Sequence, residues 1–573
     1  MSRPPLDPCS VYPEVSGLPC PDYRLPTTEP MPPAHRRKAL DELKAYETRQ
    51  KANFLGYQAN QKLDFAGELS EYLDFHVNNI GDPFVSGNFT VNSKVLERAV
   101  LDYYAKLWNA KLPSISQSDP NKPPKFTQDP ESYWGYVLTM GSSEGNIYGL
   151  WNARDYLAGK FLLPDTDDRP AGDGKPHATE TRLTYRQAPL PADNPNAFSP
   201  VCFYSQDTHY SIVKFMRVLA IDTFYAVGTA RYPGQCPLPR SGGVWPQEVP
   251  SIDNEDGPGS IDTVALSSLV SFFADKGHPI LLSLNYGTTF KGAYDDVEAA
   301  FAAIKPALQR NGLLERKVHY DPQRPDKFDI RTGYWIHVDG ALGAAYMPFV
   351  EMAYDQGHMK QRGPNFDFRL PCVMSIVMSG HKWVGAPWPC GVYMTKVKYQ
   401  LLPPDDPAYI TGSPDTTFSG SRNGFSAIIL WDYLARTSYA QEIKKALYTN
   451  GIAAYAEEQL RELEKRLKMD LWVKRSPLSL TVRFRGVKKA LITKYSLSGE
   501  GYTVRGMDYV YNHVYAMESA TRERIDQFIA ELEHTPDAFP PNPTPHVAPQ
   551  TVVATTPESP ARVFVPLTGR GFR

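Results

Sequence analysis

Apolar runs and amphipathic stretches alternate through the middle of the chain. From about residue 133, short apolar runs typical of strands alternate with stretches typical of helices. The pairs read YWGYVLTM then GSSEGNIYGLWNARDYL, VCFYS then DTHYSIVKFMRVL, HPILLSLNY then GTTFKGAYDDVEAAFAAI, YWIHV then DGALGAAY, and VMSIVMSG then HKW. This order predicts an α/β fold with a mainly parallel sheet, whose functional groups lie in loops at the carboxyl ends of the strands.

The flanking regions have other patterns. Helical spacing predicts helices within residues 36–76 and 93–108, with Ser93 as an N-cap. A strongly amphipathic helix is predicted within residues 430–470; after it, LSLTVRFR and KALITKYSL predict strands and ATRERIDQFIAELEH predicts a last helix. These elements indicate a small α+β domain at the C-terminal end.

Proline-rich segments mark both ends of the chain, and a polar segment interrupts the middle. The 52 prolines are unevenly spread: they are dense in the first 35 residues and from AFPPNPTPHVAPQ onward, a composition typical of extended or disordered arms. Residues 157–200 are rich in Pro, Gly and Asp, which indicates a surface insertion. We therefore divide the chain into a Pro-rich arm (1–35), a helical segment (36–105), a large α/β domain (106–435), a small α+β domain (436–537) and a disordered tail (538–573).

The charge balance excludes two classes of partner. Lys plus Arg number 61 and Asp plus Glu 63, for a net charge of −2, so there is no electrostatic basis for binding nucleic acid or an anionic membrane.

No apolar run approaches the roughly 18 residues of a membrane span, and the start, MSRPPLDPCS, lacks the pattern of a secretory signal. The six cysteines form no CxxC pair, which indicates neither a metal site nor a disulfide framework and favours the cytoplasm.

Two candidate catalytic residues follow apolar strands. Lys382 stands in VMSIVMSGHKWVGAPWPCGVYM, where a strand runs into a turn. Burial lowers the pKa of a lysine and makes its amine nucleophilic enough to form a Schiff base, although a lysine taken alone is more often a surface cation. Asp339 ends the strand YWIHV beside small residues, where its carboxylate could meet a flat ring or simply cap a helix.

An aldehyde cofactor of the pyridoxal phosphate type requires a lysine for its aldehyde, an anion against its ring nitrogen and donors for its phosphate. Asp339 suits the anion, with Ala341 packed against the ring. Gly141, Ser142 and Ser143 stand between a strand and a helix, so amides and the helix dipole point at an anion, although such a turn is commonly only a cap.

Further polar residues also stand at strand ends. Ser379 and His381 flank the lysine and could contact the same phosphate. His209 could stack on the ring, or it could be an ordinary buried histidine. Thr288 in NYGTTFKGA could position His209 or the cofactor, whereas the Asp295–Asp296 pair is more typical of the first turn of a helix.

The ordered blocks resemble the group II pyridoxal-phosphate-dependent amino acid decarboxylases, whose fold is fold-type I (aspartate-aminotransferase-like). The blocks run from NNIGDPFVSGNF through YWGYVLTMGSSEGN, YSQDTHYSIVK, LNYGTTFKGAYDD, IHVDGAL and SGHKWVGAPWPCGVYM to GSRNG at residues 420–424. The likeness is greatest to the histidine and plant serine decarboxylases, in which the turn more often reads GGTEGN or CGTEGN than the GSSEGN of this chain.

The resemblance implies a role for each candidate. Lys382 is implied as the lysine that binds the cofactor, Asp339 as the partner of the ring nitrogen, and His209 as the histidine that stacks on the ring. The other cofactor contacts that it implies are Gly141, Ser142, Ser143, Thr288, Ala341, Ser379 and His381.

The resemblance also implies an assembly and a reaction. The assembly is a homodimer with a shared active site, in which residues 36–105 wrap the partner. A mobile loop after the lysine is implied to carry a tyrosine that delivers a proton, and Tyr409 is the one tyrosine there, although its position also fits the start of a strand. The reaction is decarboxylation of an L-amino acid to an amine and CO2.

The substrate and two alternative functions stay open. Histidine is the first candidate substrate, then serine or another small polar amino acid, then an aromatic one. One alternative is decarboxylation with oxidative deamination to an aldehyde. The other is a protein of this fold that binds partners without catalysis.

Overall fold

The computed structural model describes most of the chain and leaves several segments out. It describes residues 25–116, 125–127, 129–165, 182–321, 326–400, 412–504 and 506–545, together with residues 15, 18 and 23. Tyr409, our candidate proton donor, lies outside the described residues.

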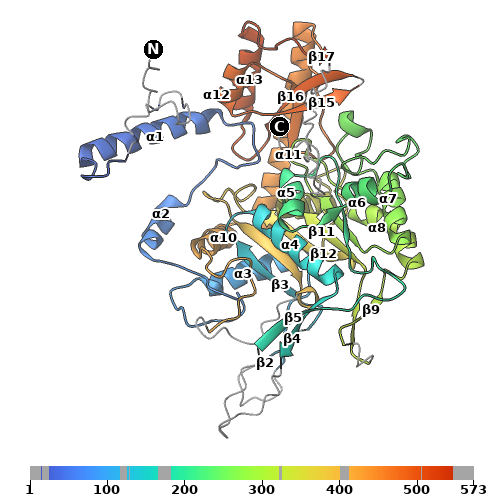
Figure 1. Ribbon diagram of the computed structural model, residues 1–573. Helices are drawn as coiled ribbons and strands as arrows, with labels where there is room; N and C mark the ends of the chain where they lie inside the picture. The colour runs from blue at the N-terminus through green and yellow to red at the C-terminus, as the bar shows by residue number, and fades with distance from the viewer. Residues whose placement is uncertain are drawn as a thin grey trace, which may run out of the picture.

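A seven-stranded sheet forms the centre of the molecule (Figure 1). Its strand order is β3-β13-β12-β11-β8-β6-β7, and all neighbours pair in parallel except β13, which is antiparallel to both β12 and β3. The strands are β3 (Tyr133–Leu138), β6 (Val201–Phe203), β7 (Asp222–Thr223), β8 (Ile280–Asn285), β11 (Tyr334–Asp339), β12 (Val373–Ser379) and β13 (Gly391–Lys396). The predicted α/β fold with a mainly parallel sheet is confirmed.

Helices follow most of the strands in the predicted alternation, but the segment after β12 that contains HKW is a turn that leads into β13. The helices are α4 (Ser142–Leu157), α5 (Tyr210–Val218), α6 (Phe224–Arg231), α7 (Thr263–Asp275), α8 (Val297–Arg310) and α9 (Gly343–Asp355). All residues of β3, β8, β11 and β12 are buried, as expected of strands that helices cover on both faces. α4 contacts β8, β11, β12 and β13, so it crosses the middle of the sheet with its first residues at the carboxyl ends of β3 and β12.

The C-terminal part has its own sheet and core. Its order is β14-β16-β15, with β17 also on β16, and all pairs are antiparallel. Its elements are α11 (Tyr439–Leu467), β14 (Thr481–Arg485), α12 (Lys489–Tyr495), β15 (Ser498–Val504), β16 (Met507–Tyr515), α13 (Arg522–His534) and β17 (Thr544–Pro545). α10 (Phe425–Arg436) precedes them and packs against β3 of the central sheet.

Two predictions for this region are wrong in detail. KALITKYSL forms α12 and not a strand, because Leu491 and Tyr495 lie four residues apart and are buried on one helical face. The tail that we predicted to be disordered from residue 538 begins with ordered residues: Ala538 accepts a hydrogen bond from the amide of Lys488, and β17 pairs with β16.

The N-terminal segment begins away from the body of the molecule and ends packed against it (Figure 1). It contains α1 (Pro33–Asn53), α2 (Ala66–Leu69), the 3-10 helix η3 (Ser70–Asp74) and α3 (Lys94–Leu107). α1 lies apart from the central sheet in Figure 1, and Ala39 is its one buried residue. Ser93 stands at the N-cap of α3 as predicted, but its hydroxyl donates to Gly424 O at 2.7 Å and does not cap the helix.

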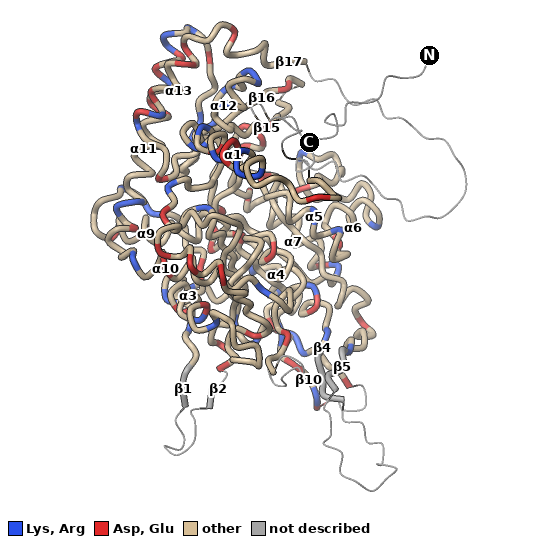
Figure 2. The backbone as a smooth tube through the Cα atoms, turned by 90° about the vertical axis from the view of Figure 1, so that its left-hand side faces the viewer, with Lys and Arg blue, Asp and Glu red and all other residues tan. Residues whose placement is uncertain are grey.

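Short hairpins and 3-10 helices complete the fold. They are β1 (Ser114–Ser116) with β2 (Lys125–Thr127), β4 (Lys160–Asp165) with β5 (Arg182–Gln187), β9 (Arg316–His319) with β10 (Phe328–Arg331), η4 (Asn254–Asp256) and η5 (Val397–Tyr399). The β4–β5 hairpin forms the described base of the insertion predicted at 157–200. Basic and acidic residues intermix along α1, α11 and α13 (Figure 2), and no described helix is long and apolar enough to cross a membrane.

A buried ion pair joins the N-terminal segment to the chain before α10. Glu97 on α3 pairs with Arg422, and both side chains are at most 1% exposed. Glu97 also accepts from the amide of Val137 on β3 at 2.9 Å, while Arg422 donates to Gly81 O at 2.9 Å. The pair thus ties three distant segments to one edge of the central sheet.

Removing one partner of this pair should strongly destabilise the protein. In Arg422→Met, Glu97 keeps a buried and uncompensated charge, so we expect the free energy of unfolding to fall by about 3–5 kcal/mol. In the matched control Arg310→Met, the lost pair with Asp275 is half-exposed, at 56% and 50%, and the loss should stay below about 1 kcal/mol. Urea unfolding measures both; equal losses would contradict the anchoring role.

Candidate active site

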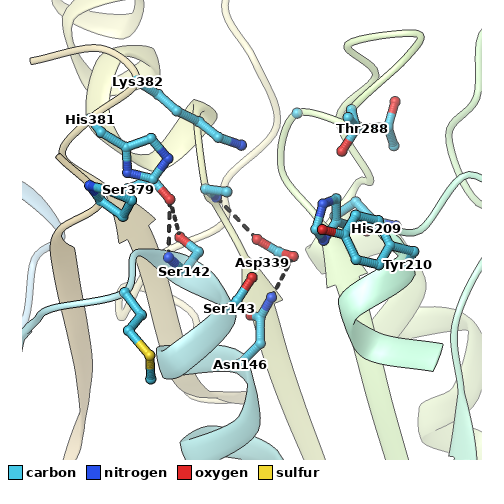
Figure 3. A pocket seen from close by; sticks show the side chains of 16 residues that line it. Ser142, Ser143, Asn146, His209, Tyr210, Thr288, Asp339, Ser379, His381 and Lys382 are labelled. Carbon is cyan, nitrogen blue, oxygen red and sulfur yellow. Dashed lines mark hydrogen bonds between the residues drawn. The ribbon is translucent and has the colours of Figure 1, made fainter. Parts of the chain in front are cut away.

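A cavity of about 220 Å³ opens at the carboxyl ends of the central strands (Figure 3). Its lining consists of Met140, Ser142, Ser143, Asn146, His209, Tyr210, Asn285, Gly287, Thr288, Thr289, Asp339, Ala341, Ser379, His381, Lys382 and Pro389. Nine of our eleven predicted site residues are among them. Gly141 stands between the lining residues Met140 and Ser142, and Tyr409 is the one outside the described residues.

One end of the cavity gathers hydroxyl groups at a helix N-terminus. Ser142 begins α4, its amide donates to Ser379 Oγ at 3.0 Å, and Ser379 Oγ in turn donates to Ser142 Oγ at 2.8 Å. Gly141 has φ 70°, and a Cβ there would lie 2.6 Å from Cε1 of His381. The glycine therefore lets the turn approach His381 closely, and the helix dipole and hydroxyls together suit a phosphate.

The amine of Lys382 points into the cavity from the turn after β12 (Figure 3). Its backbone is held on both sides, because its amide donates to Ser379 O at 3.3 Å and its carbonyl accepts from the amide of Asn60 at 3.1 Å. Burial lowers the pKa of the amine to about 8, and the negative charge of Asp339 opposes that shift. A larger share of the amine is therefore neutral and nucleophilic at physiological pH than in an exposed lysine.

The carboxylate of Asp339 faces the same cavity from the end of β11 (Figure 3). It is 6% exposed. Oδ2 accepts from Asn146 Nδ2 at 2.8 Å, and Oδ1 accepts from the amide of Ala341 at 3.2 Å. Both donors are neutral, so the carboxylate keeps its negative charge available for a positive group in the cavity.

His209 stands at the cap of the helix that follows β6. Its Nδ1 accepts from the amide of Ser211 at 3.3 Å and lies 2.7 Å from Ser211 Oγ. Burial lowers the pKa of the ring to about 4, with Asp339 raising it and Lys382 lowering it further, so the ring is neutral at pH 7. A neutral imidazole on the cavity wall suits contact with a flat ring.

Thr288 and the two aspartates after it have definite structural positions. The Thr288 hydroxyl accepts from the amide of Ala293 at 2.9 Å, which stabilises the turn that brings the residue to the cavity. Asp296 lies at the start of a helix as predicted, but as the N-cap of α8, where its side chain accepts from the amide of Ala299. The reading of Asp295 as an ordinary first-turn charge is wrong: it is buried, accepts from the amides of Ile261 and Asn285 at 2.6 and 2.7 Å, and burial raises its pKa to about 6.

Sequence reasoning missed several lining residues. The most important is Asn146, one helical turn after Ser142 in GSSEGN and thus on the same face of α4. Asn285 is the last residue of β8, where the strand-end rule also applied. Met140, Tyr210 and Pro389 gave no chemical signal, because apolar wall residues look like ordinary core or loop positions in a sequence.

The residues present fit pyridoxal phosphate. The cavity combines an anion cradle, a lysine with a lowered pKa and a buried carboxylate, which are the three groups that this cofactor requires. The charges are also complementary, since the cofactor carries a phosphate at one end and a ring nitrogen that accepts a proton at the other. In the part of the chain that the structure describes, no cluster of His, Cys, Asp and Glu could hold a metal ion.

Comparison with known proteins identifies relatives along nearly the whole chain. The family described as Pyridoxal-dependent decarboxylase conserved domain matches residues 240–461, which contain Asp339 and Lys382. The chain is 26% identical over 512 residues to Serine decarboxylase 2 of Oryza sativa subsp. japonica, covering 88% of this chain and 80% of the relative. It is 28% identical to Histidine decarboxylase of Solanum lycopersicum, covering 83% of this chain and 84% of the relative.

Solved structures show both a more similar protein and a more distant one. The internal aldimine form of L-methionine decarboxylase from Streptomyces sp.590 superposes with a TM-score of 0.80 at 46% identity, covering 92% of this chain and 98% of that chain. The glutamate decarboxylase of Lactobacillus brevis superposes with a TM-score of 0.54 at 17% identity, covering 90% of this chain and 97% of that chain, and shows the fold alone.

Replacing the candidate lysine should remove cofactor attachment without unfolding the protein. We expect Lys382→Ala to lose the absorbance band that arises when a lysine binds the aldehyde of pyridoxal phosphate. As a control, Lys465→Met replaces a lysine that is 72% exposed and pairs with Glu462, so its loss leaves no buried charge without a partner and the band should remain. Absorbance spectra of the purified variants decide the point; a band in Lys382→Ala would show that another lysine is used.

The pH dependence of cofactor capture should report the lowered pKa of Lys382. Because only the neutral amine attacks an aldehyde, the capture rate in cofactor-free protein should rise with pH to a midpoint near the pKa of about 8, below the ordinary 10.5. Asp339→Asn removes the charge that raises this pKa, so its midpoint should lie lower still. Asp275→Asn, at an exposed carboxylate, is the control; a wild-type midpoint near 10.5 in stopped-flow absorbance would contradict a desolvated amine.

Proposed function

The chain belongs to the pyridoxal-phosphate-dependent amino acid decarboxylases, and on that premise we propose that its substrate is L-methionine. The support is a difference in similarity. Identity is 45–46% to the methionine decarboxylase of Streptomyces sp.590 and 25–28% to the serine and histidine decarboxylases. We therefore place methionine ahead of histidine, our first candidate from the sequence.

The charges of the cavity support an uncharged substrate side chain. Among the described lining residues, only Asp339 and Lys382 carry a charge at neutral pH, because burial lowers the pKa of both His209 and His381 to about 4. Our assignment gives both charged groups to the cofactor. A charged substrate side chain would thus be desolvated without a partner from the described lining, at a cost of several kcal/mol.

The mouth of the cavity offers apolar surface instead. Met140 and Tyr210 line the cavity and are 55% and 47% exposed, and Pro389 lines it as well. A thioether packs favourably against an aromatic ring. These contacts suit the side chain of methionine better than the polar imidazole of histidine or the hydroxyl of serine.

We assign roles to the cavity residues on this basis. Lys382 would hold the cofactor by its aldehyde, and Asp339 would keep a proton on its ring nitrogen. The phosphate would be held by Gly141, Ser142, Ser143, Ser379 and His381. When bound, pyridoxal phosphate supplies an electron sink for the electron pair that remains as CO2 leaves.

The remaining assigned residues orient and shield. Ala341 is small enough to leave room beside Asp339, and Thr288 holds the wall of the cavity through its bond to Ala293. His209 would cover one face of the site as a neutral ring, so it would add no charge that competes with the ring nitrogen of the cofactor for Asp339. We keep Tyr409 as the proposed proton donor to the substrate carbon.

We further propose a homodimer with a shared active site. Its support is apolar surface on the N-terminal segment: Leu73 and Phe75 are 70% and 60% exposed and line a groove of about 480 Å³ with Trp388 and Phe425. A second copy covering this groove would remove an exposed apolar patch.

The four cysteines that the structure describes are all unpaired, which supports our proposal of a cytoplasmic location.

A substrate panel tests the proposed function. With pyridoxal phosphate supplied, we expect L-methionine to yield CO2 and 3-methylthiopropylamine with a kcat/KM at least about tenfold above histidine and serine. Asp339→Asn, which keeps the shape of the site, should lose turnover on every amino acid by orders of magnitude. Mass spectrometry of amine products measures both.

Other outcomes of the same panel identify the alternatives. Faster turnover of histidine or of an aromatic amino acid would overturn the methionine assignment. An aldehyde with ammonia and peroxide would indicate oxidative deamination. Loaded enzyme without turnover of any of the twenty amino acids would favour a non-catalytic binding protein.

A further inference from the structure

A continuous chain of hydrogen bonds leads from the interior of the sheet to Asp339. Trp335 Nε1 donates to Ser375 Oγ at 3.1 Å, and Ser375 Oγ lies 2.8 Å from His337 Nδ1. His337 Nε2 lies 2.9 Å from Asn146 Oδ1, and Asn146 Nδ2 donates to Asp339 Oδ2 at 2.8 Å. All five side chains are buried.

The alternation of side chains along β11 explains how this series of hydrogen bonds forms. Trp335, His337 and Asp339 are two residues apart, so their side chains project from the same face of the strand. Ser375 is the register partner of His337 on β12. α4 packs against both strands and brings Asn146 between His337 and Asp339.

A glycine lets α4 approach the histidine closely. A Cβ at Gly149 would lie 3.0 Å from both Cε1 and Nδ1 of His337, tighter than ordinary van der Waals contact. Gly149 is three residues after Asn146, on the same side of the helix. The position is thus shaped to hold the imidazole against the helix.

The two residues that end this series of hydrogen bonds, Asp339 and Trp335, determine the direction of every bond in it. An ionised carboxylate only accepts, so the amide nitrogen of Asn146 must face Asp339 and its oxygen must face His337. His337 therefore carries its proton on Nε2, and its Nδ1 accepts from the Ser375 hydroxyl. The indole of Trp335 can only donate, which agrees with its place at the other end.

The histidine in this chain is neutral. Burial lowers the pKa of His337 to about 4, and Asp339 opposes that shift. A neutral ring has one N–H and one acceptor, as the direction derived above requires. None of the residues hydrogen-bonded in series behind Asp339 carries a positive charge, so this series of hydrogen bonds does not neutralise the carboxylate.

We propose that His337 and Asn146 are positioning residues that hold the Asp339 carboxylate ionised and aimed into the cavity through neutral hydrogen bonds. A lysine or arginine in the place of Asn146 would orient the carboxylate equally well but would cancel its charge. The proposal rests on the proposed role of Asp339 toward the cofactor ring. It goes beyond that role by naming the residues that maintain it.

The first test does not depend on measuring enzyme activity. In cofactor-free protein labelled with ¹⁵N-histidine, the resonances of His337, assigned by their loss in His337→Phe, should show a neutral ring protonated on Nε2 at pH 7. A charged ring, or a proton on Nδ1, would overturn the proposal. If His337→Phe does not fold, Asn146→Leu serves for assignment, because the His337 Nε2 resonance should shift when its acceptor is lost.

The second test measures function in the cofactor-loaded enzyme. His337→Phe and Asn146→Leu keep much of the side-chain volume and remove the polar contacts, and each should lower kcat about 10- to 100-fold with KM changed less than about twofold, as expected when a bond to a charged group is lost. Because both substitutions break the same series of hydrogen bonds, the kcat of the double variant should be no lower than that of the poorer single variant. The matched control is His278→Phe, at a buried histidine bonded to Ser199 O and outside the cavity lining, which should keep the wild-type kcat.

These measurements separate the two proposals. Wild-type kcat in both single variants would overturn the positioning role and leave the decarboxylase function intact. If no amino acid is turned over at all, the histidine tautomer and the dissociation constant for pyridoxal phosphate still test the hydrogen-bond chain. The dissociation constant should rise about tenfold or more in Asn146→Leu and stay unchanged in the His278 control.

Discussion

A buried carboxylate facing a buried amine is the constraint on which the site depends. Burying an isolated carboxylate costs several kcal/mol, so Asp339 requires hydrogen-bond partners that stabilise its charge without neutralising it. It has them in the amide of Asn146 and the backbone N–H of Ala341. Lys382 faces the same cavity with a pKa lowered to about 8. The charge of one group and the reactivity of the other thus follow from the same low-dielectric surroundings.

The sheet topology explains why these groups meet. β11, β12, β8 and β6 run in parallel, so the residues that follow them gather at one edge. Asp339, Ser379 with Lys382, Thr288 and His209 come from four separate strands. α4 adds its N-terminus and Asn146 at the same edge, so one end of the sheet supplies the phosphate cradle, the lysine and the carboxylate.

The features that could be predicted from the sequence are those with local signals. Short apolar runs alternating with helical stretches indicated the parallel sheet, and the polar residue after each run indicated where the side chains gather. KALITKYSL misled because a short apolar segment has no clear period, and tertiary packing of Leu491 and Tyr495 decided for a helix.

Features that depend on contacts between distant segments could not be predicted in this way. Asp295 looked like a surface charge, but it is buried where Asn285 and Ile261 offer two amides. His337 looked like one more residue of an apolar strand, and only the packing of α4 on β11 reveals its bond to Asn146. Substrate preference also stayed open, since it depends on wall residues such as Met140 and Tyr210 without a chemical motif.

The most direct test of the central claim is to find which lysine binds the cofactor. Borohydride reduction of the loaded protein makes the bond between cofactor and lysine permanent, and peptide mass spectrometry then locates the modified residue. The account predicts one pyridoxyl group, on the peptide that contains Lys382. A modification on Lys291 or any other lysine instead would contradict it.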